Sequence, residues 1–297
     1  MTRQFALAIM PGDRSTIEDL PRIAAEAYAL SARLCGDCRN QHALWSYLRL
    51  SRASTGAEKQ DSKLEAELRG FFAGGRTHVL IAGAQDTGLL ALVARAGAGF
   101  RLNITVLDIC GTPLELCGKL AGQWSLPIET VQQDLFDLDV EWRFDVVLVH
   151  GTLNFIAAER HAEVLRRLQR SLRPGGRMAL LFNTSRAVAA DLAAENHAEY
   201  ADFVLSELKR LGIPLPDQEA AIRERLIDRA RQREQRDRQF ADSDEVVALV
   251  DAAGFDVVSC APTSGELAKP ADALLKQFSK RRFMLIAAPK PATSSRG

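Results

Sequence analysis

Short apolar runs alternate with amphipathic stretches through the middle of the chain. Five β-rich runs, nearly all apolar, occupy residues 79–83, 102–109, 128–134, 144–150 and 177–183. A strand that is apolar at every position is buried on both faces, which is typical of a parallel sheet covered by helices. Two further runs at 255–261 and 282–288 complete the pattern. The sequence therefore predicts an α/β fold with a mostly parallel sheet of seven strands.

Helical periodicity precedes and interrupts this sheet pattern. A capping-box sequence at 15–18 starts one helix, and others are expected at 41–52, 62–72, 187–211 and 218–240. We expect the chain to have three parts. A helical substrate-capping region covers 1–76, a cofactor-binding domain covers 77–290 and contains a helical insert at about 184–242, and a disordered tail covers 291–297.

Composition excludes several classes of protein. Lys and Arg total 38 and Asp and Glu total 38, and this balance disfavours a dedicated nucleic-acid binder. No apolar run approaches the ~18 residues of a membrane span, and the first residues lack a signal-peptide pattern. The odd count of five Cys does not suggest a disulfide framework. These features favour a cytoplasmic protein. The Arg-rich 219–238 segment is expected to be an ion-paired helix or a homodimer contact.

Candidate chemistry begins where the first two strands end. A glycine-bearing turn, Gly83-Ala84-Gln85-Asp86-Thr87-Gly88, follows the first strand and would let a cofactor approach the backbone. The second strand ends at Asp108, about twenty residues beyond the turn, where a carboxylate accepts hydrogen bonds from ribose hydroxyls. Together they predict a nucleoside-binding site.

The order of motifs resembles the class I S-adenosylmethionine-dependent methyltransferases. VLIAGAQDTG resembles their glycine-rich motif, VLDI the ribose-binding segment, QQDLFD the adenine-contacting segment, FDVVLVHGTLNFI the fourth-strand motif and LRPGG the turn before the fifth strand. The resemblance covers roughly 76–183 and 244–288 and implies S-adenosylmethionine as cofactor and S-adenosylhomocysteine as product. It implies cofactor-binding residues Gly83, Ala84, Gln85, Asp86, Thr87, Gly88, Asp108, Ile109, Asp134, Leu135, His150 and Gly151.

The first motif departs from the family pattern of three closely spaced glycines. Gln85 and Asp86 stand where glycine is expected. One hypothesis is that they bind the amino group of the methionine moiety; the other is that Asp86 or Thr87 caps the following helix. The spacing also resembles a dinucleotide fingerprint, so an NAD(P)-binding oxidoreductase is an alternative. A Gln side chain at position 85 would obstruct a pyrophosphate there.

His150 ends the fourth strand, beside the transferring methyl group in this family. The following residues are not the Asp/Asn-Pro-Pro-Tyr/Phe pattern, which disfavours methylation of adenine or of glutamine nitrogen. His150 is a candidate general base for a hydroxyl, thiol or ammonium acceptor; alternatively it packs on the cofactor or binds a loop carbonyl. We expect methyl transfer to an O, N or S atom of a small molecule in specialised biosynthesis. The alternatives are a non-catalytic S-adenosylmethionine-binding scaffold and an RNA or protein methyltransferase.

The helical additions are expected to enclose the acceptor. The candidate lining residues are polar or aromatic: Tyr28, His42, Trp45, Tyr47, Arg49, Asn154, Asn183, Arg186, His197 and Tyr200. Cys35-x-x-Cys38-x-x-x-His42 combines zinc-ligand types, but only three are local and a fourth is not evident from the sequence. We therefore predict no metal; buried thiols or a pocket wall around His42 explain the motif equally well.

Overall fold

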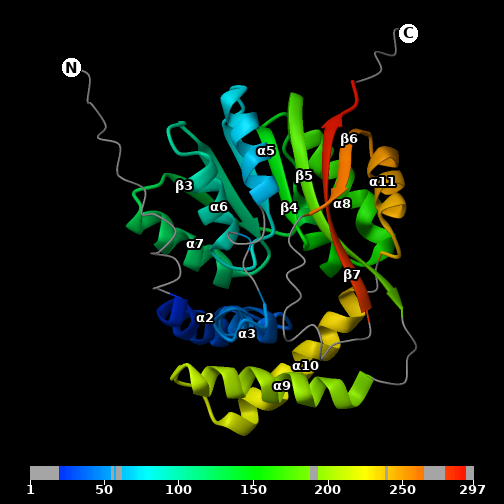
Figure 1. Ribbon diagram of the computed structural model, residues 1–297. Helices are drawn as coiled ribbons and strands as arrows, with labels where there is room; N and C mark the ends of the chain where they lie inside the picture. Colours follow the sequence, from blue (N-terminus) through cyan, green and yellow to red (C-terminus); the bar gives the residue numbers. More distant parts are fainter. Residues whose placement is uncertain are drawn as a thin grey trace, which may run out of the picture.

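The computed structural model describes residues 20–54, 57, 62–187, 193–237, 240–263 and 278–291. Within these ranges one seven-stranded sheet has the order β3-β2-β1-β4-β5-β7-β6 (Figure 1). The pairs among β1 to β5 are parallel, and β7 is antiparallel to both of its neighbours. The strands are β1 His78–Ala82, β2 Asn103–Asp108, β3 Ile128–Gln132, β4 Phe144–His150, β5 Leu172–Ala187, β6 Phe255–Pro262 and β7 Phe278–Pro289. The predicted sheet is confirmed, while the 15–18 capping box and nearly all of the 291–297 tail lie outside the described residues.

After His78, strand β1 is apolar because both faces of the sheet are covered. Val79 and Ile81 pack into one core, and Leu80 and Ala82 pack into the other. Successive side chains of a strand point to opposite faces, so each position contributes to one core or the other. The first core contains α5 (Ser62–Ala73), α6 (Gly88–Ala96) and α7 (Gly111–Gln123), and the second contains α8 (His161–Ser171) and α11 (Ser243–Ala252).

Strand β5 is longer than the apolar pattern predicts. Its pairing with β4 jumps from Phe144↔Leu172 to Val146↔Arg177, so the RPGG segment forms an irregularity within the strand. At the other end, β5 pairs with β7 as far as Ala187↔Phe278. The helical insert therefore follows residue 187 rather than starting at about 184, and the last strand starts at 278 rather than 282. The added pairs are mostly polar, and hydrophobic periodicity does not mark them.

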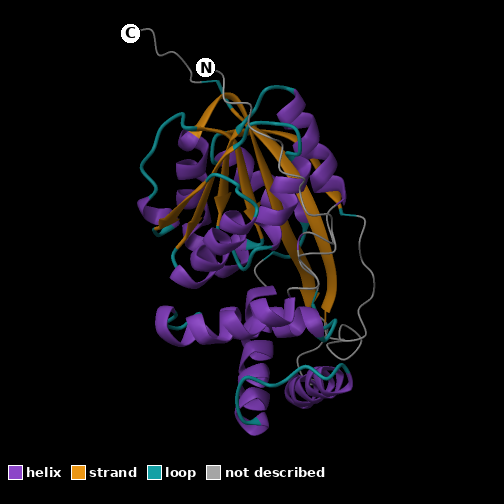
Figure 2. Cartoon of the chain, turned by 90° about the vertical axis from the view of Figure 1, so that its left-hand side faces the viewer, coloured by secondary structure: helices purple, strands orange, loops and turns teal. Residues whose placement is uncertain are grey.

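Four helices form a second layer across the carboxyl ends of the strands (Figures 1 and 2). They come from two distant parts of the chain, α2 (Leu20–Leu34) and α3 (Arg39–Leu50) before the sheet, and α9 (Ala193–Arg210) and α10 (Glu219–Asp237) between β5 and β6. We call these four helices the helical layer. They share an apolar core that includes Leu44, Leu48, Val204 and Leu226. The N-terminal helices and the insert are thus one packed unit, and an insert between β5 and β6 is confirmed.

Helix α10 is both charged and packed. Arg223 pairs with Asp202 of α9 at 2.7 Å, as an ion-paired helix predicts. Ile222, Leu226 and Ala230 nevertheless enter the core of the helical layer, and Arg229 is 3% exposed, 5.5 Å from the Trp45 ring. A homodimer contact through this helix stays a prediction. None of the described helices combines the length and apolarity needed to cross a membrane.

Asp145 of β4 generates a pH-dependent prediction. Its Oδ2 accepts the Thr77 and His78 backbone N–H groups at 3.0 and 2.9 Å, and Arg173 lies 3.2 Å from Oδ1. Burial alone would raise the pKa of Asp145, but hydrogen bonds from His78, Thr77 and Arg173 outweigh it and hold that pKa below its usual value. A depressed folded-state pKa adds stability above the unfolded-state pKa of about 4, and this stability is lost as pH falls through the folded value.

We expect Asp145→Asn to lower the free energy of unfolding by about 1–3 kcal/mol at pH 7. The difference from the wild-type chain should shrink as pH falls from about 5 towards 2, because the wild-type carboxylate is then protonated. Urea unfolding across this pH range measures it. Asp139→Asn, at an exposed position, is the matched control. A deficit that is independent of pH would contradict the assignment.

Candidate functional site

The strand order reverses between β1 and β4, and the candidate site lies at the carboxyl ends of the strands around this point. In an open parallel sheet such a switch point leaves a crevice where ligands bind. The turn after β1 starts at Gly83, β2 ends at Asp108, Asp134 follows β3, and β4 ends at His150. All four predicted segments therefore share one edge of the sheet, next to the helical layer.

Gly83 is required by local geometry. Its φ is +87°, and a Cβ there would lie 2.5 Å from Thr152 Oγ1. The Thr152 hydroxyl donates to the Ala82 carbonyl at 2.9 Å, so the loops after β1 and β4 are in direct contact. Gly151, at φ +71°, turns the chain after His150 into this contact. Only glycine reaches such φ values without strain and leaves room for Thr152.

Asp86 joins the turn after β1 to the helical layer. Its Oδ1 accepts the Gly88 N–H at 2.8 Å at the start of α6, while Oδ2 accepts the Trp45 indole N–H at 2.9 Å and pairs with Arg49. The Arg49 and Asp86 side chains are 5% and 8% exposed. Both oxygens are engaged, which supports the capping hypothesis for Asp86. Trp45 and Arg49, expected to line the acceptor pocket, contact this carboxylate instead.

Asp108 lies between the two turns that follow β1 and β2. Its Oδ2 accepts the Ala84 N–H at 2.7 Å and its Oδ1 accepts the Cys110 N–H at 2.8 Å. Burial raises the pKa of Asp108, although these backbone hydrogen bonds and the His42 charge act in the opposite direction. The next residue, Ile109, is 64% exposed, an unusual position for a large apolar side chain. The arrangement presents a carboxylate beside an open apolar surface.

In the segment after β3, one residue lies at the candidate site and the next packs into the core. Asp134 Oδ1 accepts the Phe136 N–H at 3.0 Å, which caps the short helix η1 (Leu135–Asp137). The second carboxylate oxygen makes no hydrogen bond within the part of the chain that the structure describes. Leu135 is 7% exposed and belongs to the core beneath the sheet. Asp134 is therefore available at this edge, whereas the Leu135 side chain is committed to the core.

Buried amide groups without protein partners lie beside the switch point. Both polar side-chain atoms of Asn154 and the Nε2 of Gln85 are buried without a hydrogen-bond partner among the described residues. Asn154 follows β4 in η2 (Thr152–Phe155) and Gln85 follows β1, and these two strands are neighbours. A buried polar group left unpaired costs about 1–3 kcal/mol. Such groups fit a polar ligand bound between these loops.

Other predicted lining residues serve the helical layer itself. Tyr47 and Tyr200 are 3% and 0% exposed within its core, and burial raises the pKa of Tyr47 to about 12. The Tyr28 hydroxyl donates to Asp217 at 3.0 Å. Residue type alone does not separate a packed aromatic from a pocket aromatic, which is why the sequence grouped them. His197 is buried in α9, and Asn183 of β5 accepts a hydrogen bond from Arg282 at 3.3 Å, while the Arg186 side chain lies outside the described residues.

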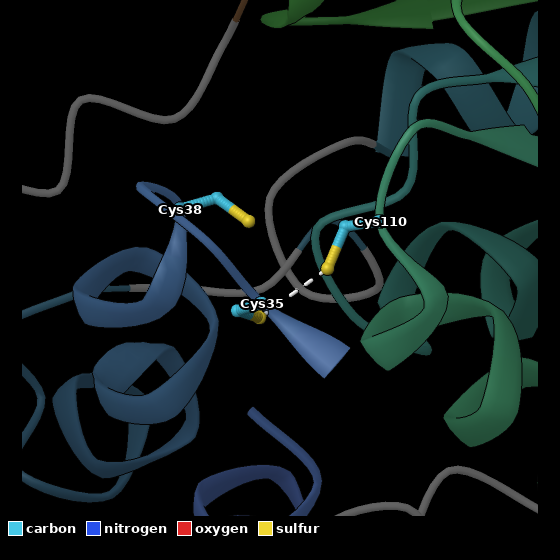
Figure 3. Close-up of side chains that lie close together, drawn as sticks. All are labelled: Cys35, Cys38 and Cys110. Atoms are coloured by element: carbon cyan, nitrogen blue, oxygen red, sulfur yellow. Dashed lines mark hydrogen bonds between the residues drawn. The ribbon is translucent and has the colours of Figure 1, made fainter. Parts of the chain in front are cut away.

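Cys110 is a residue of this edge that sequence reasoning missed. It precedes α7 and lies 3.3 Å, sulfur to sulfur, from Cys35 (Figure 3). Burial alone would raise the pKa of Cys110, but hydrogen bonding to His42 and the His42 charge hold it below its usual value. Burial alone would lower the pKa of His42, but Cys110 and Cys38 raise it. The only available signal was a cysteine two positions after Asp108.

This sheet order, with an antiparallel strand between β5 and β6 and an acid after β2, defines the fold of class I S-adenosylmethionine-dependent methyltransferases. A dinucleotide-binding fold would instead have the order 3-2-1-4-5-6. A family model described as "Methyltransferase domain" matches residues 82–180. Residues 82–180 therefore match a methyltransferase domain, and the sheet that contains them has the fold of this class.

Two curated relatives each match about a third of this chain. One is the carboxy-S-adenosyl-L-methionine synthase of Ectopseudomonas mendocina (strain ymp), 32% identical over 113 residues, which are 34% of this chain and 45% of that protein. The other is the synthase of the same name from Aeromonas hydrophila, 30% identical over 102 residues, covering 33% and 41%. The matched region spans less than half the length of these relatives.

Solved structures agree on the fold. The phosphoethanolamine N-methyltransferase 2 of Haemonchus contortus, in complex with S-adenosylmethionine, has a TM-score of 0.54 at 11% identity, covering 86% of this chain and 58% of that one. A structure of the cyclase SpnF has a TM-score of 0.50 at 13% identity, covering 84% and 93%. At these identities the likeness establishes the fold alone.

The Arg49–Asp86 pair generates a prediction about stability. Arg49→Met should cost about 3–5 kcal/mol of unfolding free energy, because it leaves a buried carboxylate without its counter-ion. Chemical denaturation measures the loss, and Arg33→Met, at an exposed position of α2, is the control. In a double-mutant cycle with Asp86→Asn, the combined loss should be smaller than the sum of the single losses. Additive losses would contradict a direct interaction.

Proposed function

We propose that this chain binds S-adenosylmethionine at the carboxyl ends of β1 to β4 and transfers its methyl group to an O, N or S atom of a small molecule. One observation carries the proposal: the Asp108 carboxylate and the unpaired buried amides of Gln85 and Asn154 share the switch point of a methyltransferase sheet. The cofactor would supply an electrophilic methyl group on a sulfonium. The chain's own residues would hold it and align the acceptor.

Each end of the cofactor has a matching group in the structure. The Asp108 carboxylate, with lone pairs beyond its two backbone hydrogen bonds, would accept the ribose hydroxyls. Exposed Ile109 would pack against the adenine, and Asp134 would accept from the adenine amino group. Gln85 and Asn154 would bind the polar end of the methionine moiety. We further propose that the glycine turn and the His150–Gly151 segment contact the cofactor mainly through the backbone.

The position of the helical layer favours a small molecule over a macromolecule as the methyl acceptor. It lies across the carboxyl ends of the sheet, and α3 contacts the turn after β1 directly through Asp86. A surface covered in this way favours a molecule that fits beneath helices over a nucleic-acid strand or a folded protein. We infer from the even charge balance a cytoplasmic protein without a nucleic-acid partner. RNA methylation would instead require salt-sensitive RNA binding.

Asp108→Asn tests the cofactor site. We expect S-adenosylhomocysteine to bind the variant about 10- to 100-fold more weakly, because a charge-assisted hydrogen bond is worth about 1.5–3 kcal/mol. Isothermal titration calorimetry with the purified full chain measures the dissociation constant. Asp137→Asn, at an exposed position in the neighbouring helix η1, should bind like the wild type. Binding of neither S-adenosylmethionine nor S-adenosylhomocysteine to the wild-type chain would refute the proposal.

His150→Gln tests the proposed general base. His150 is half-buried at the end of β4. We expect the substitution to lower the methyl-transfer rate about 100-fold or more, in line with general-base catalysis, while the cofactor dissociation constant changes less than about threefold. The readout is S-adenosylhomocysteine formation with the acceptor identified from a panel of hydroxyl, thiol and amine compounds. An undiminished rate would assign His150 to packing alone.

A second candidate function follows from the names of the matched relatives. Those proteins are synthases of a carboxylated S-adenosylmethionine, so the methyl donor itself would be the molecule modified. Mass spectrometry of the nucleoside products separates the candidates. S-adenosylhomocysteine supports methyl transfer, and carboxy-S-adenosylmethionine supports the synthase. Binding without turnover over a broad panel of acceptors would support a scaffold.

A further inference from the structure

Three cysteines and one histidine meet between the helical layer and the turn after β2. Cys35 and Cys38 lie in the connection between α2 and α3, and Cys110 precedes α7. Their three sulfur atoms all lie within 4.8 Å of one another. Figure 3 shows the three side chains facing one small space. We call these residues together with His42 the thiol–imidazole cluster.

His42 completes the cluster from one turn further along α3. Its ring lies beside Cys110 and Cys38, which raise the pKa of His42, and its Nδ1 lies 3.3 Å from the Gln85 carbonyl oxygen. A carbonyl only accepts hydrogen bonds, so Nδ1 carries the proton in this contact and Nε2 is left with its lone pair. Histidines that bind metals usually donate their other ring N–H to a carbonyl or carboxylate in this way.

We propose that the thiol–imidazole cluster is a structural Zn²⁺ site with ligands Cys35, Cys38, Cys110 and His42. Three thiolates and one imidazole form a closed four-ligand set of the kind that zinc occupies in structural sites. A tetrahedral ion with Zn–S distances of about 2.3 Å separates its sulfurs by about 3.8 Å. The sulfur–sulfur separations, from 3.3 Å for Cys35–Cys110 up to the 4.8 Å limit, are close to this value, whereas His42 lies outside that limit and would have to turn towards the three sulfurs to complete the set. Cys110 is the fourth ligand that the local Cys-x-x-Cys-x-x-x-His spacing lacked.

The burial of the four side chains fits an ion that binds from solution and is then shielded from it. Cys110 and His42 are 4% and 8% exposed, whereas Cys35 and Cys38 are half-buried and leave a path for the ion. The ion would join helices α2 and α3 to the sheet at a second point besides Asp86. Because Cys110 donates its backbone N–H to Asp108, the ion would also hold the turn that carries the carboxylate proposed to bind ribose. This last consequence rests on the proposed function; the metal site does not.

A Cys35–Cys110 disulfide is the competing interpretation. It requires a sulfur–sulfur bond of about 2.05 Å, which these two side chains could reach by rotation. It would use two of the four groups and leave the positions of Cys38 and His42 without an explanation. Zinc accounts for all four, and the two interpretations differ in metal content and in thiol reactivity.

The test uses the full chain, produced in zinc-supplemented medium and purified under reducing conditions without a polyhistidine tag. We expect one zinc per chain by plasma mass spectrometry. Of the five thiols, only half-buried Cys260 should then react with a thiol reagent under native conditions, rising to all five after chelation and denaturation. Cys110→Ser and Cys38→Ser should lose most of the metal. Cys260→Ser, at a half-buried position on β6, should keep it.

Cobalt replacement covers the case in which a serine variant folds poorly. Co²⁺ added to the chelated wild-type chain should produce thiolate charge-transfer and tetrahedral absorption bands, and Zn²⁺ should abolish them. A folded, metal-free chain with five reactive thiols, a mapped Cys35–Cys110 disulfide in the reduced preparation, or zinc retained by Cys110→Ser would each overturn the site. Metal content is measured without cofactor. A zinc-bearing chain that fails to bind S-adenosylhomocysteine would therefore refute the proposed function and leave the metal site standing.

Discussion

The buried contact of Asp86 with Arg49 and Trp45 is the interaction on which the shape of the candidate site depends. An ionised carboxylate is costly to bury, and here it is balanced by a guanidinium, an indole N–H and the Gly88 backbone N–H at the start of α6. The turn after β1 and helix α3 therefore cannot move independently without exposing or unpairing a charge. In related enzymes this turn is glycine-rich, and here a charged side chain replaces a glycine and links the turn to the added helices.

The same edge of the sheet combines groups whose hydrogen bonds are complete with groups whose hydrogen bonds are not. Both carboxylate oxygens of Asp86 are engaged within the protein, so Asp86 shapes the site. Gln85 Nε2 and both polar side-chain atoms of Asn154 are buried without a hydrogen-bond partner among the described residues, and the apolar Ile109 side chain is exposed. A protein tolerates such features where a ligand removes their cost. This contrast separates the residues that build the site from those we propose to bind the cofactor.

The match to a methyltransferase domain covers residues 82–180, one third of the chain. The helical layer accounts for much of the remaining sequence. Helices from before β1 and from between β5 and β6 share one apolar core and lie over the carboxyl ends of the strands. Neither pair of helices buries its apolar face alone, so each depends on the other. Because the layer contacts the turn after β1 and the turn after β2, changes in helix packing would be transmitted directly to the proposed cofactor site.

The sequence by itself determined the sheet, because strands buried on both faces must be apolar at every position and helices between them must be amphipathic. It also placed Asp108, Asp134 and His150 at strand ends, since strand ends follow from the same periodicity. Only the tertiary structure decided which polar side chains pair with other groups of the protein and which have no such partner among the described residues. Trp45 and Arg49 turned out to contact Asp86, Tyr47 and Tyr200 to fill a core, and Cys110 to meet Cys35 from 75 residues away. Those partners are brought together by chain crossovers and helix packing, and local sequence patterns carry no record of such long-range contacts.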